Sequence, residues 1–210
     1  MPLMWRVIAF VTFAFFLEGC GIRAPELPIT YVPQQNAQPI KDSDLVSVQV
    51  KVEDLQPETL NYFLASNRHF QVKNAPGTIK EAAETELKSR GFKIGDGGAL
   101  VIIQLIHFEG DLDTEPSGIT TTAHGNLIMR VQVRPQNGKV LYSREVGGEG
   151  TPVSKVFMWH PATHELELSL SDAFKRLFAD SAFTAAILAT RQSPTTKPSS
   201  VKPVAPALTP

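Results

Sequence analysis

Cysteine is nearly absent from this chain, because Cys20 is the only one in 210 residues. A single thiol forms no internal disulfide bond and cannot supply a cysteine metal site. Charge of neither sign dominates either: 20 Lys and Arg side chains stand against 21 Asp and Glu, with no long basic run. This balance gives no support for electrostatic binding of nucleic acid. The length suits one globular domain with tails.

The apolar run at the N-terminus is too short for a transmembrane helix. Val7–Leu17 contains eleven residues, and as a helix it would rise about 16 Å, roughly half of a bilayer core. With Arg6 before it and small residues after it, the run is typical of a secretory signal peptide. The sequence therefore predicts that this segment directs export.

The residues that follow, Leu17-Glu18-Gly19-Cys20, resemble the bacterial lipobox. Leu and Gly match the pattern, whereas Glu18 stands where a small or neutral residue is usual. The resemblance implies cleavage before Cys20 and lipid attachment to its sulfur, so the membrane is the first expected partner. An ordinary signal peptide and a buried helix with an incidental cysteine remain open alternatives. Gly21, rather than Asp, favours the outer membrane, with its periplasmic face as the expected side.

Composition divides the chain into four expected parts. Residues 1–19 are the predicted lipoprotein signal peptide, and residues 20–44, rich in Pro, Gln and Asn, are a predicted flexible tether. Residues 45–190 form a single periplasmic domain. The remaining residues, 191–210, are a Pro-, Ser- and Thr-rich tail that we predict to be disordered.

Hydrophobic periodicity predicts strands and two helices in the domain. Alternating valines mark a strand at 46–52, "HFQVKN" a short strand, and "ALVIIQLIHF" a central strand covered on both faces. The segment "TTTAHGNLIMRVQVR" alternates, and Asn137-Gly138 predicts a hairpin into "KVLYSREVGGEG". One helix is predicted from a capping box at Thr78 and Glu81 to a stop at Gly91.

A second helix is predicted from about Thr163, with buried positions at three- and four-residue spacing: Leu166, Leu170, Ala173, Phe174, Leu177, Phe178 and Ala182. The order of elements predicts an α+β fold: a mixed, mainly antiparallel sheet of about four to five strands with two helices packed on it.

The whole pattern resembles the YajG family of bacterial lipoproteins. The residues that carry the resemblance are the lipobox, the valine strand, "LKSRGFKIGDGGALVIIQL", "GNLIMRVQVRPQNGKVLYSREVGGEG" and the closing helix, which together cover roughly residues 1 to 189. The resemblance implies an outer-membrane-associated lipoprotein of uncharacterised function with no known catalytic residues. The segment after Val52 and the C-terminal tail depart from the family pattern.

Motifs that carry chemistry are weak. His160 and His164 have helical spacing for Zn²⁺, but Pro161 lies between them and no zincin glutamate is present, so we interpret them as ordinary loop or cap residues. Glu109, Asp111, Asp113 and Glu115 alternate in a segment that lacks the EF-hand pattern, and we expect a solvated loop between strands. "GDGG" and "GGEG" are interpreted as turns or a bulge. We therefore predict no enzyme activity, no metal and no cofactor.

An apolar run at Val156, Phe157, Met158 and Trp159 is the candidate interaction patch, provided that it is exposed. Burial of alternate residues under the sheet edge is the competing interpretation. The leading hypothesis is an acyl-anchored, non-enzymatic binding or scaffolding module with an envelope protein partner of unknown identity. An accessory subunit of an envelope assembly or transport complex is the alternative, and a hydrolase with an unrecognised site is a third.

Overall fold

The fold is known from a computed structural model that describes residues 26–34, 37–57, 67–114, 121–136, 138–150, 153–155 and 160–192. Side chains are not described at every one of these positions. The strands are β1 Glu26–Leu27, β2 Ser47–Asp54, β3 Asn67–Val72, β4 Lys93–Ile94, β5 Ala99–Thr114, β6 Thr121–Pro135, β7 Tyr142–Glu149 and β8 Val153–Lys155. The helices are α2 Ala75–Ser89, α3 His160–Ala179 and α4 Ser181–Ala189, with short 3₁₀ turns at Ser43–Leu45 and Thr190–Gln192.

Two long antiparallel strands, β5 and β6, form the middle of an eight-stranded sheet. On the outer side of β5, β2 pairs in parallel with the first half and β3 antiparallel with the second half. On the outer side of β6 lie β7 and β8. The short strands β4 and β1 add in parallel to β2 and β3. The α+β class is confirmed, but the sheet is mixed rather than mainly antiparallel, and it has more strands than predicted.

The change from β2 to β3 along β5 occurs at a β-bulge between Leu105 and His107. Beyond β2, the Leu55 amide still donates to the Leu105 carbonyl at 2.8 Å. The side-chain oxygen of Gln56 then accepts from the Phe108 amide at 2.8 Å. These contacts satisfy backbone groups of β5 in the interval between its two neighbours, so the strand continues without interruption.

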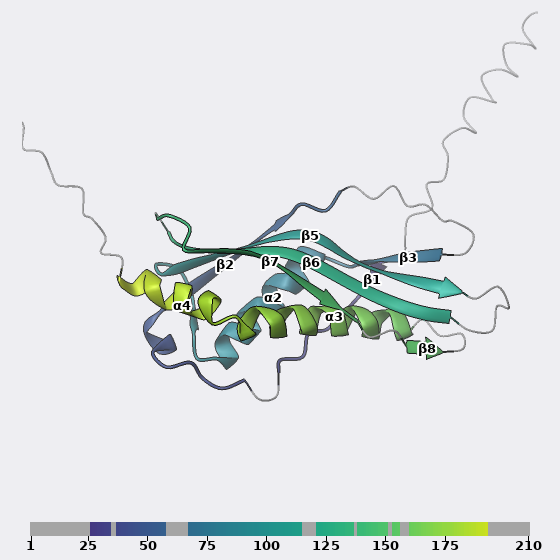
Figure 1. The fold of residues 1–210 in the computed structure, drawn as a ribbon, viewed down its shortest axis with the longest axis horizontal. Coiled ribbons are helices and arrows are strands. Elements are labelled where there is room, and N and C mark those ends of the chain that lie inside the picture. The colour runs from purple at the N-terminus through teal and green to yellow at the C-terminus, as the bar shows by residue number, and fades with distance from the viewer. Residues whose placement is uncertain are drawn as a thin grey trace, which may run out of the picture.

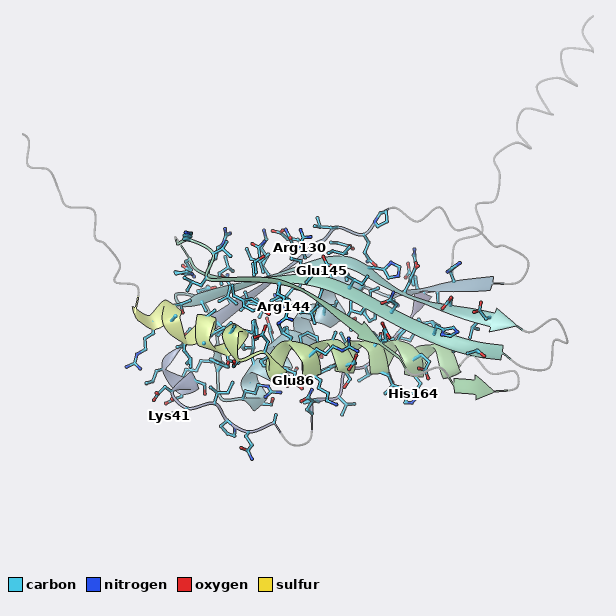
Figure 2. All side chains as sticks on the ribbon, in the orientation of Figure 1. Lys41, Glu86, Arg130, Arg144, Glu145 and His164 are labelled. Carbon is cyan, nitrogen blue, oxygen red and sulfur yellow. The ribbon has the colours of Figure 1, made fainter. Side chains whose placement is uncertain are left out.

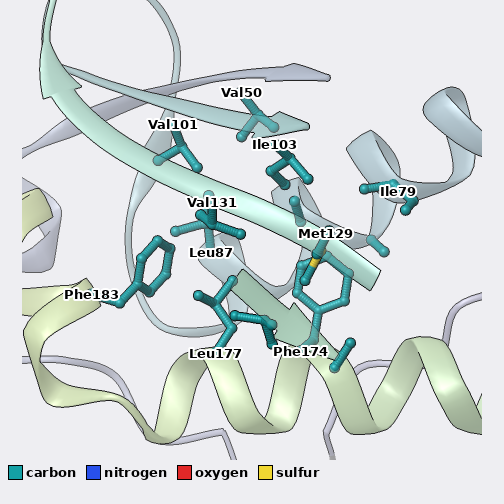
Figure 3. Packing of buried hydrophobic residues seen from close by; sticks show 14 of the residues in the cluster. Val50, Ile79, Leu87, Val101, Ile103, Met129, Val131, Phe174, Leu177 and Phe183 are labelled. Atoms are coloured by element: carbon teal, nitrogen blue, oxygen red, sulfur yellow. The ribbon is translucent and has the colours of Figure 1, made fainter. Parts of the chain in front are cut away.

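The described helices α2, α3 and α4 all lie on one face of the sheet (Figure 1). The inward face of β6 carries Ala123, Leu127, Met129, Val131 and Val133, each with no exposed surface, as the alternation predicted. Figure 3 shows Met129 and Val131 among Phe174 and Leu177 of α3, Phe183 of α4 and Leu87 of α2. Burial of these apolar side chains provides the main stabilisation of the domain.

None of the described helices covers the opposite face of the sheet, which we call the open face. The prediction that β5 is covered on both faces is therefore wrong in part. Ile102 is nevertheless only 5 % exposed on this face, and its partners in neighbouring strands are Lys51 and Gln132. Long polar side chains shelter such apolar positions with their methylene groups while their polar ends stay in water.

Helix α2 begins earlier than the capping-box pattern predicted. It starts at Ala75 after Asn74, which has a positive φ of 50° and makes no side-chain capping bond. The Thr78 hydroxyl donates to the Asn74 carbonyl, so the predicted capping box with Glu81 is not formed. The predicted end is confirmed, because Gly91 follows the helix with φ 91°.

The predicted C-terminal helix is two helices, because Asp180 interrupts it. Asp180 has extended φ and ψ angles, and its carboxylate accepts from the Ala182 amide at 3.0 Å, so it caps α4. Arg144 of β7 also donates to it at 2.8 Å, and Tyr142 at 3.0 Å. Ala182, predicted to be buried, is exposed because α4 runs in a new direction.

Glycines let α3 approach the sheet at backbone distance. An added Cβ at Gly125 of β6 would lie 2.4 Å from the Glu165 carbonyl, and one at Gly148 of β7 would lie 2.0 Å from the Ser169 carbonyl. The interpretation of "GGEG" as a turn or bulge is therefore wrong, since its first three residues belong to β7. "GDGG" is a turn, in which Gly97 has φ 96°.

Substitution of Gly148 by Ala tests this close packing. We expect Gly148→Ala to lower the free energy of unfolding by about 1–3 kcal/mol, because the methyl group overlaps the backbone of α3. Gly147→Ala is the matched control, since its Cβ would meet nothing nearer than the Leu127 carbonyl at 3.7 Å. Urea titration followed by circular dichroism measures both variants, and equal stabilities would contradict the packing described.

Candidate functional site

The two sites predicted most specifically from the sequence, Cys20 and Val156–Trp159, lie outside the described residues. His160 is the first residue of α3, and His164, one turn later, is exposed (Figure 2). No group of three or more His, Cys, Asp or Glu side chains in the described part of the chain is arranged to hold a metal ion. None of the helices described there is long and apolar enough to cross a membrane.

The acidic residues expected in a loop instead belong to β5. Glu109, Asp111 and Asp113 lie at alternate positions of this strand, with their side chains on the open face, while Glu115 lies outside the described residues. The loop prediction is wrong because pairing with β3 and β6 continues through these residues, from Glu109↔Asn126 to Thr114↔Thr121. Backbone hydrogen bonds from β5 to a neighbouring strand on each side outweigh the low β-propensity of Asp and Glu.

Three histidines gather beside these carboxylates on the open face. Asp111 lies between His69 of β3 and His124 of β6 in the strand register. The His107 Nε2 lies 3.3 Å from a Glu109 oxygen, and the His124 Nε2 lies 3.6 Å from an Asp113 oxygen. We call these six residues the acidic face; they lie over the half of the sheet that contains β3.

The other half of the open face carries a charged ladder. Glu53 accepts from Lys51 at 2.7 Å and from Gln104 at 3.1 Å, and Arg130 pairs with Glu145 at 3.4 Å. Arg130 and Glu145 lie on the side of the sheet away from α3 (Figure 2). The hydrogen bond from Lys51, followed by that from Gln104, lowers the pKa of Glu53. The opposite charges within each of these exposed ion pairs balance, and such pairs contribute little to the free energy of unfolding.

The N-terminal segment is the part of the structure that sequence analysis missed. The tether prediction for residues 20–44 needs correcting from Glu26 onward, because residues 26–34 and 37–44 pack on the domain. Leu27, Ile29 and Tyr31 contact the main core. The Thr30 amide donates to Glu167 of α3 at 3.1 Å, and Lys73 donates to the Leu27 carbonyl at 2.9 Å. We call residues 26–34 the strap.

Glu86 of α2 holds the strap. Its carboxylate has no exposed surface, and it accepts from the Tyr31 hydroxyl and from the Gln34 amide, the latter at 2.9 Å. Arg90 lies 3.3 Å from the other oxygen of Glu86 and stacks over the Phe178 ring, with 4.3 Å to the ring centroid. Burial, followed by the hydrogen bond to Glu86, raises the pKa of Tyr31, so the phenol stays a donor. The strap thus joins α2 to α3.

One signal in the sequence points to this network. Glu86 falls between Ala83 and Leu87 on the buried stripe of α2, where a carboxylate requires a partner. Arg90 at the i+4 position supplies one. Tyr31, however, is 55 residues away in sequence, and no local periodicity indicates it.

A second buried carboxylate, Glu165, has no partner among the described residues. Its side chain has no exposed surface, and neither oxygen accepts a hydrogen bond. It lies beside Gly150, where an added Cβ would be 2.7 Å from its Oε2. Burial raises the pKa of Glu165, and the nearby His164 and His124 partly oppose this shift. The raised pKa favours the protonated carboxyl group, which loses less hydration than the ion.

Comparisons with known proteins leave the family open. No family model matches the chain, and no curated protein matches it. Among solved structures, a minor lipoprotein from Acinetobacter baumannii is similar, with a TM-score of 0.41 and 6 % identity over 66 % of this chain and 94 % of that one. A neuraminyllactose-binding hemagglutinin homolog from Helicobacter pylori has a TM-score of 0.40 and 7 % identity, over 77 % and 97 % of the two chains.

Both TM-scores lie below 0.5, so these similarities assign neither a family nor a function to the chain. The resemblance to the YajG family stays a prediction from the sequence.

Tyr31→Phe tests the hold of Glu86 on the strap. Loss of the hydroxyl removes a donor from a fully buried carboxylate, so we expect the free energy of unfolding to fall by about 1–3 kcal/mol. Tyr142→Phe removes the same group from Asp180, whose side chain is 17 % exposed and keeps Arg144, so a smaller loss is expected. Urea titration of both variants provides the comparison, and an equal or larger loss for Tyr142→Phe would contradict it.

Glu165→Gln tests the unpartnered carboxyl group. The pKa of Glu165 is raised in the folded state. The contribution of its protonated carboxyl group to the free energy of unfolding is therefore complete below the ordinary pKa, and it is lost as pH rises through the pKa of the folded state. The wild-type protein should therefore lose stability relative to Glu165→Gln as pH increases above about 4.5. Urea titrations from pH 4 to 8 measure the difference, with the exposed Glu81→Gln as control. Parallel curves for wild type and Glu165→Gln would rule out the shift.

Proposed function

We propose that the protein is a non-enzymatic binding or scaffolding module, anchored by an acyl group on Cys20 to the periplasmic side of the bacterial outer membrane. Residues 1–19 act as the signal peptide in this proposal, and Gly21 allows outer-membrane sorting. Diacylglycerol thioether and amide-linked chains together would hold the protein firmly, whereas a single acyl chain binds a bilayer only marginally.

The position of the lone cysteine carries the proposal. Cys20 closes an export-type segment, and the first described residue of the domain, Glu26, follows only six positions later and already lies in a strand. Within the part of the chain that the structure describes, the sheet begins with β1 at Glu26–Leu27, after the proposed cleavage point before Cys20.

The polar groups of the described structure support binding rather than catalysis. The carboxylates that lie inside the domain, Glu86 and Glu165, have no exposed surface for a substrate to reach. Those of the open face lie on the surface of a sheet, next to histidine, lysine or arginine partners. A surface of this kind fits polar contacts with a macromolecule, and general acid–base chemistry requires groups that converge on a substrate.

An accessory role in an envelope complex is the alternative, and its proposed docking point is Val156–Trp159. This run precedes α3, whose first turn packs in a smaller cluster with Phe70, Leu112 and Ala123 through Ala162. A photocrosslinker placed at Trp159 distinguishes the two roles. One dominant crosslinked envelope protein is expected for an accessory subunit, whereas a dispersed pattern favours a general binding module.

Metabolic labelling with radioactive palmitate tests the anchor directly. Wild type should incorporate label and sediment with outer-membrane vesicles, while Cys20→Ala should lose both properties because the sulfur that carries the lipid is gone. Gly21→Asp is the matched control: we expect it to keep the label and to move to the inner-membrane fraction. Label that persists in Cys20→Ala would refute the proposal.

A further inference from the structure

We infer that the domain stands on the bilayer with one end, formed by β1, β3 and the paired ends of β5 and β6, toward the membrane. We call this end the tip; its described residues are 26–27, 67–71, 109–114 and 121–125. The opposite end, where residues 136 and 138–141 lie between β6 and β7, points away from the membrane. This inference rests on the proposed acylation of Cys20.

The direction in which the chain enters the sheet is the first observation. Glu26 and Leu27 of β1 pair in parallel with Gln71 and Val72, the last residues of β3. Strand β3 starts at Asn67, opposite Asp113 near the end of β5, and runs toward the middle of the sheet. Since β1 runs the same way, the chain enters β1 from the side of the tip.

The strap fixes how much chain is free to act as a tether. From Leu27 onward the chain is held by core packing, by Thr30 with Glu167, and by Tyr31 and Gln34 with the buried Glu86. Pulling further residues out of the strap would leave the buried Glu86 carboxylate without the hydrogen bonds from Tyr31 and Gln34. In the sequence, only residues 21–25 lie between the proposed anchor at Cys20 and β1.

The length of this tether matches the distance to the tip. Six residue steps separate Cys20 from Glu26, and a fully extended chain covers about 20 Å over them. Through Gln71, Glu26 is level with Glu109 of β5, and the five steps from Glu109 to Thr114 span about 17 Å of strand. The ten steps from Glu109 back to Ala99 span about 33 Å. The anchor therefore reaches the level of the tip but not the opposite end.

Charge opposes the arrangement in which the domain lies flat on its open face. The acidic face has Glu109, Asp111 and Asp113 on this side, and the described ion-pair partners of Glu109 and Asp113 are histidines. Contact with lipid phosphates would desolvate these carboxylates and place like charges together within about one Debye length of 8 Å. An upright domain keeps the open face in water, accessible to a partner from the side.

Energy transfer to labelled lipid tests the orientation. The full chain is produced with its own leader, purified in its acylated form and reconstituted in phosphatidylcholine vesicles that contain a rhodamine-labelled headgroup. A donor dye is attached through Asp113→p-azidophenylalanine at the tip or Lys139→p-azidophenylalanine at the opposite end; both side chains are exposed. We expect quenching at position 113 to exceed that at position 139 by about twofold or more, given their separation along the strands. Equal quenching, or stronger quenching at position 139, would overturn the inference.

A longer tether provides the matched control. Insertion of twelve Gly and Ser residues between Gly21 and Ile22 leaves the strap intact. The contrast, which is the ratio of quenching at position 113 to quenching at position 139, should then fall toward one. An undiminished contrast would show that tether length does not set the orientation. Intact mass and flotation with vesicles separate the two failures: an unacylated chain refutes the proposed function, whereas an acylated, floating chain without the contrast refutes only the orientation.

Discussion

The buried carboxylate of Glu86 is the constraint that joins the rest of the structure. It sits on the inward stripe of α2, where burial of a charge is costly unless donors surround it. Those donors come from Tyr31 and Gln34 of the strap, and Arg90 adds an ion pair one helical turn away. The strap also contacts α3, through Thr30 with Glu167 and through the Tyr31 ring, which lies 5.5 Å from that of Phe174. Residues 26–34, whose composition predicted a linker, are thus part of the domain.

The asymmetry of the sheet follows from where the helices pack. Glycines in β6 and β7 allow the backbone of α3 to approach the backbone of the sheet closely on one face. Apolar residues of β5 and β6 fill the space between the sheet and helices α2 and α4. The other face is not covered by any helix that the structure describes, and it carries a charged ladder at one half and the acidic face at the other. A module of this shape offers one broad polar surface, with the strap and helices behind it.

Local patterns predicted the elements whose structure depends on local residues. The alternation in β2 and β6, the stripe of α2 and its stop at Gly91 were all confirmed. The extension of β5 through Glu109–Asp113 was missed because pairing on both sides, rather than composition, keeps that strand extended. The break at Asp180 was missed because the apolar spacing continues across it, while the carboxylate caps α4 and binds Arg144. The parallel pairing of β2 with β5 and the hold of Glu86 on Tyr31 are contacts between distant segments, which no short window of sequence contains.

Native-state hydrogen exchange at the strap is the most direct test of whether these residues belong to the folded domain. The Thr30 and Gln34 amides donate to Glu167 and Glu86, so they should exchange as slowly as amides of the neighbouring α2. Exchange of both amides at the rate of an unstructured peptide, with α2 still protected, would show that the strap is a free tether and would contradict the account.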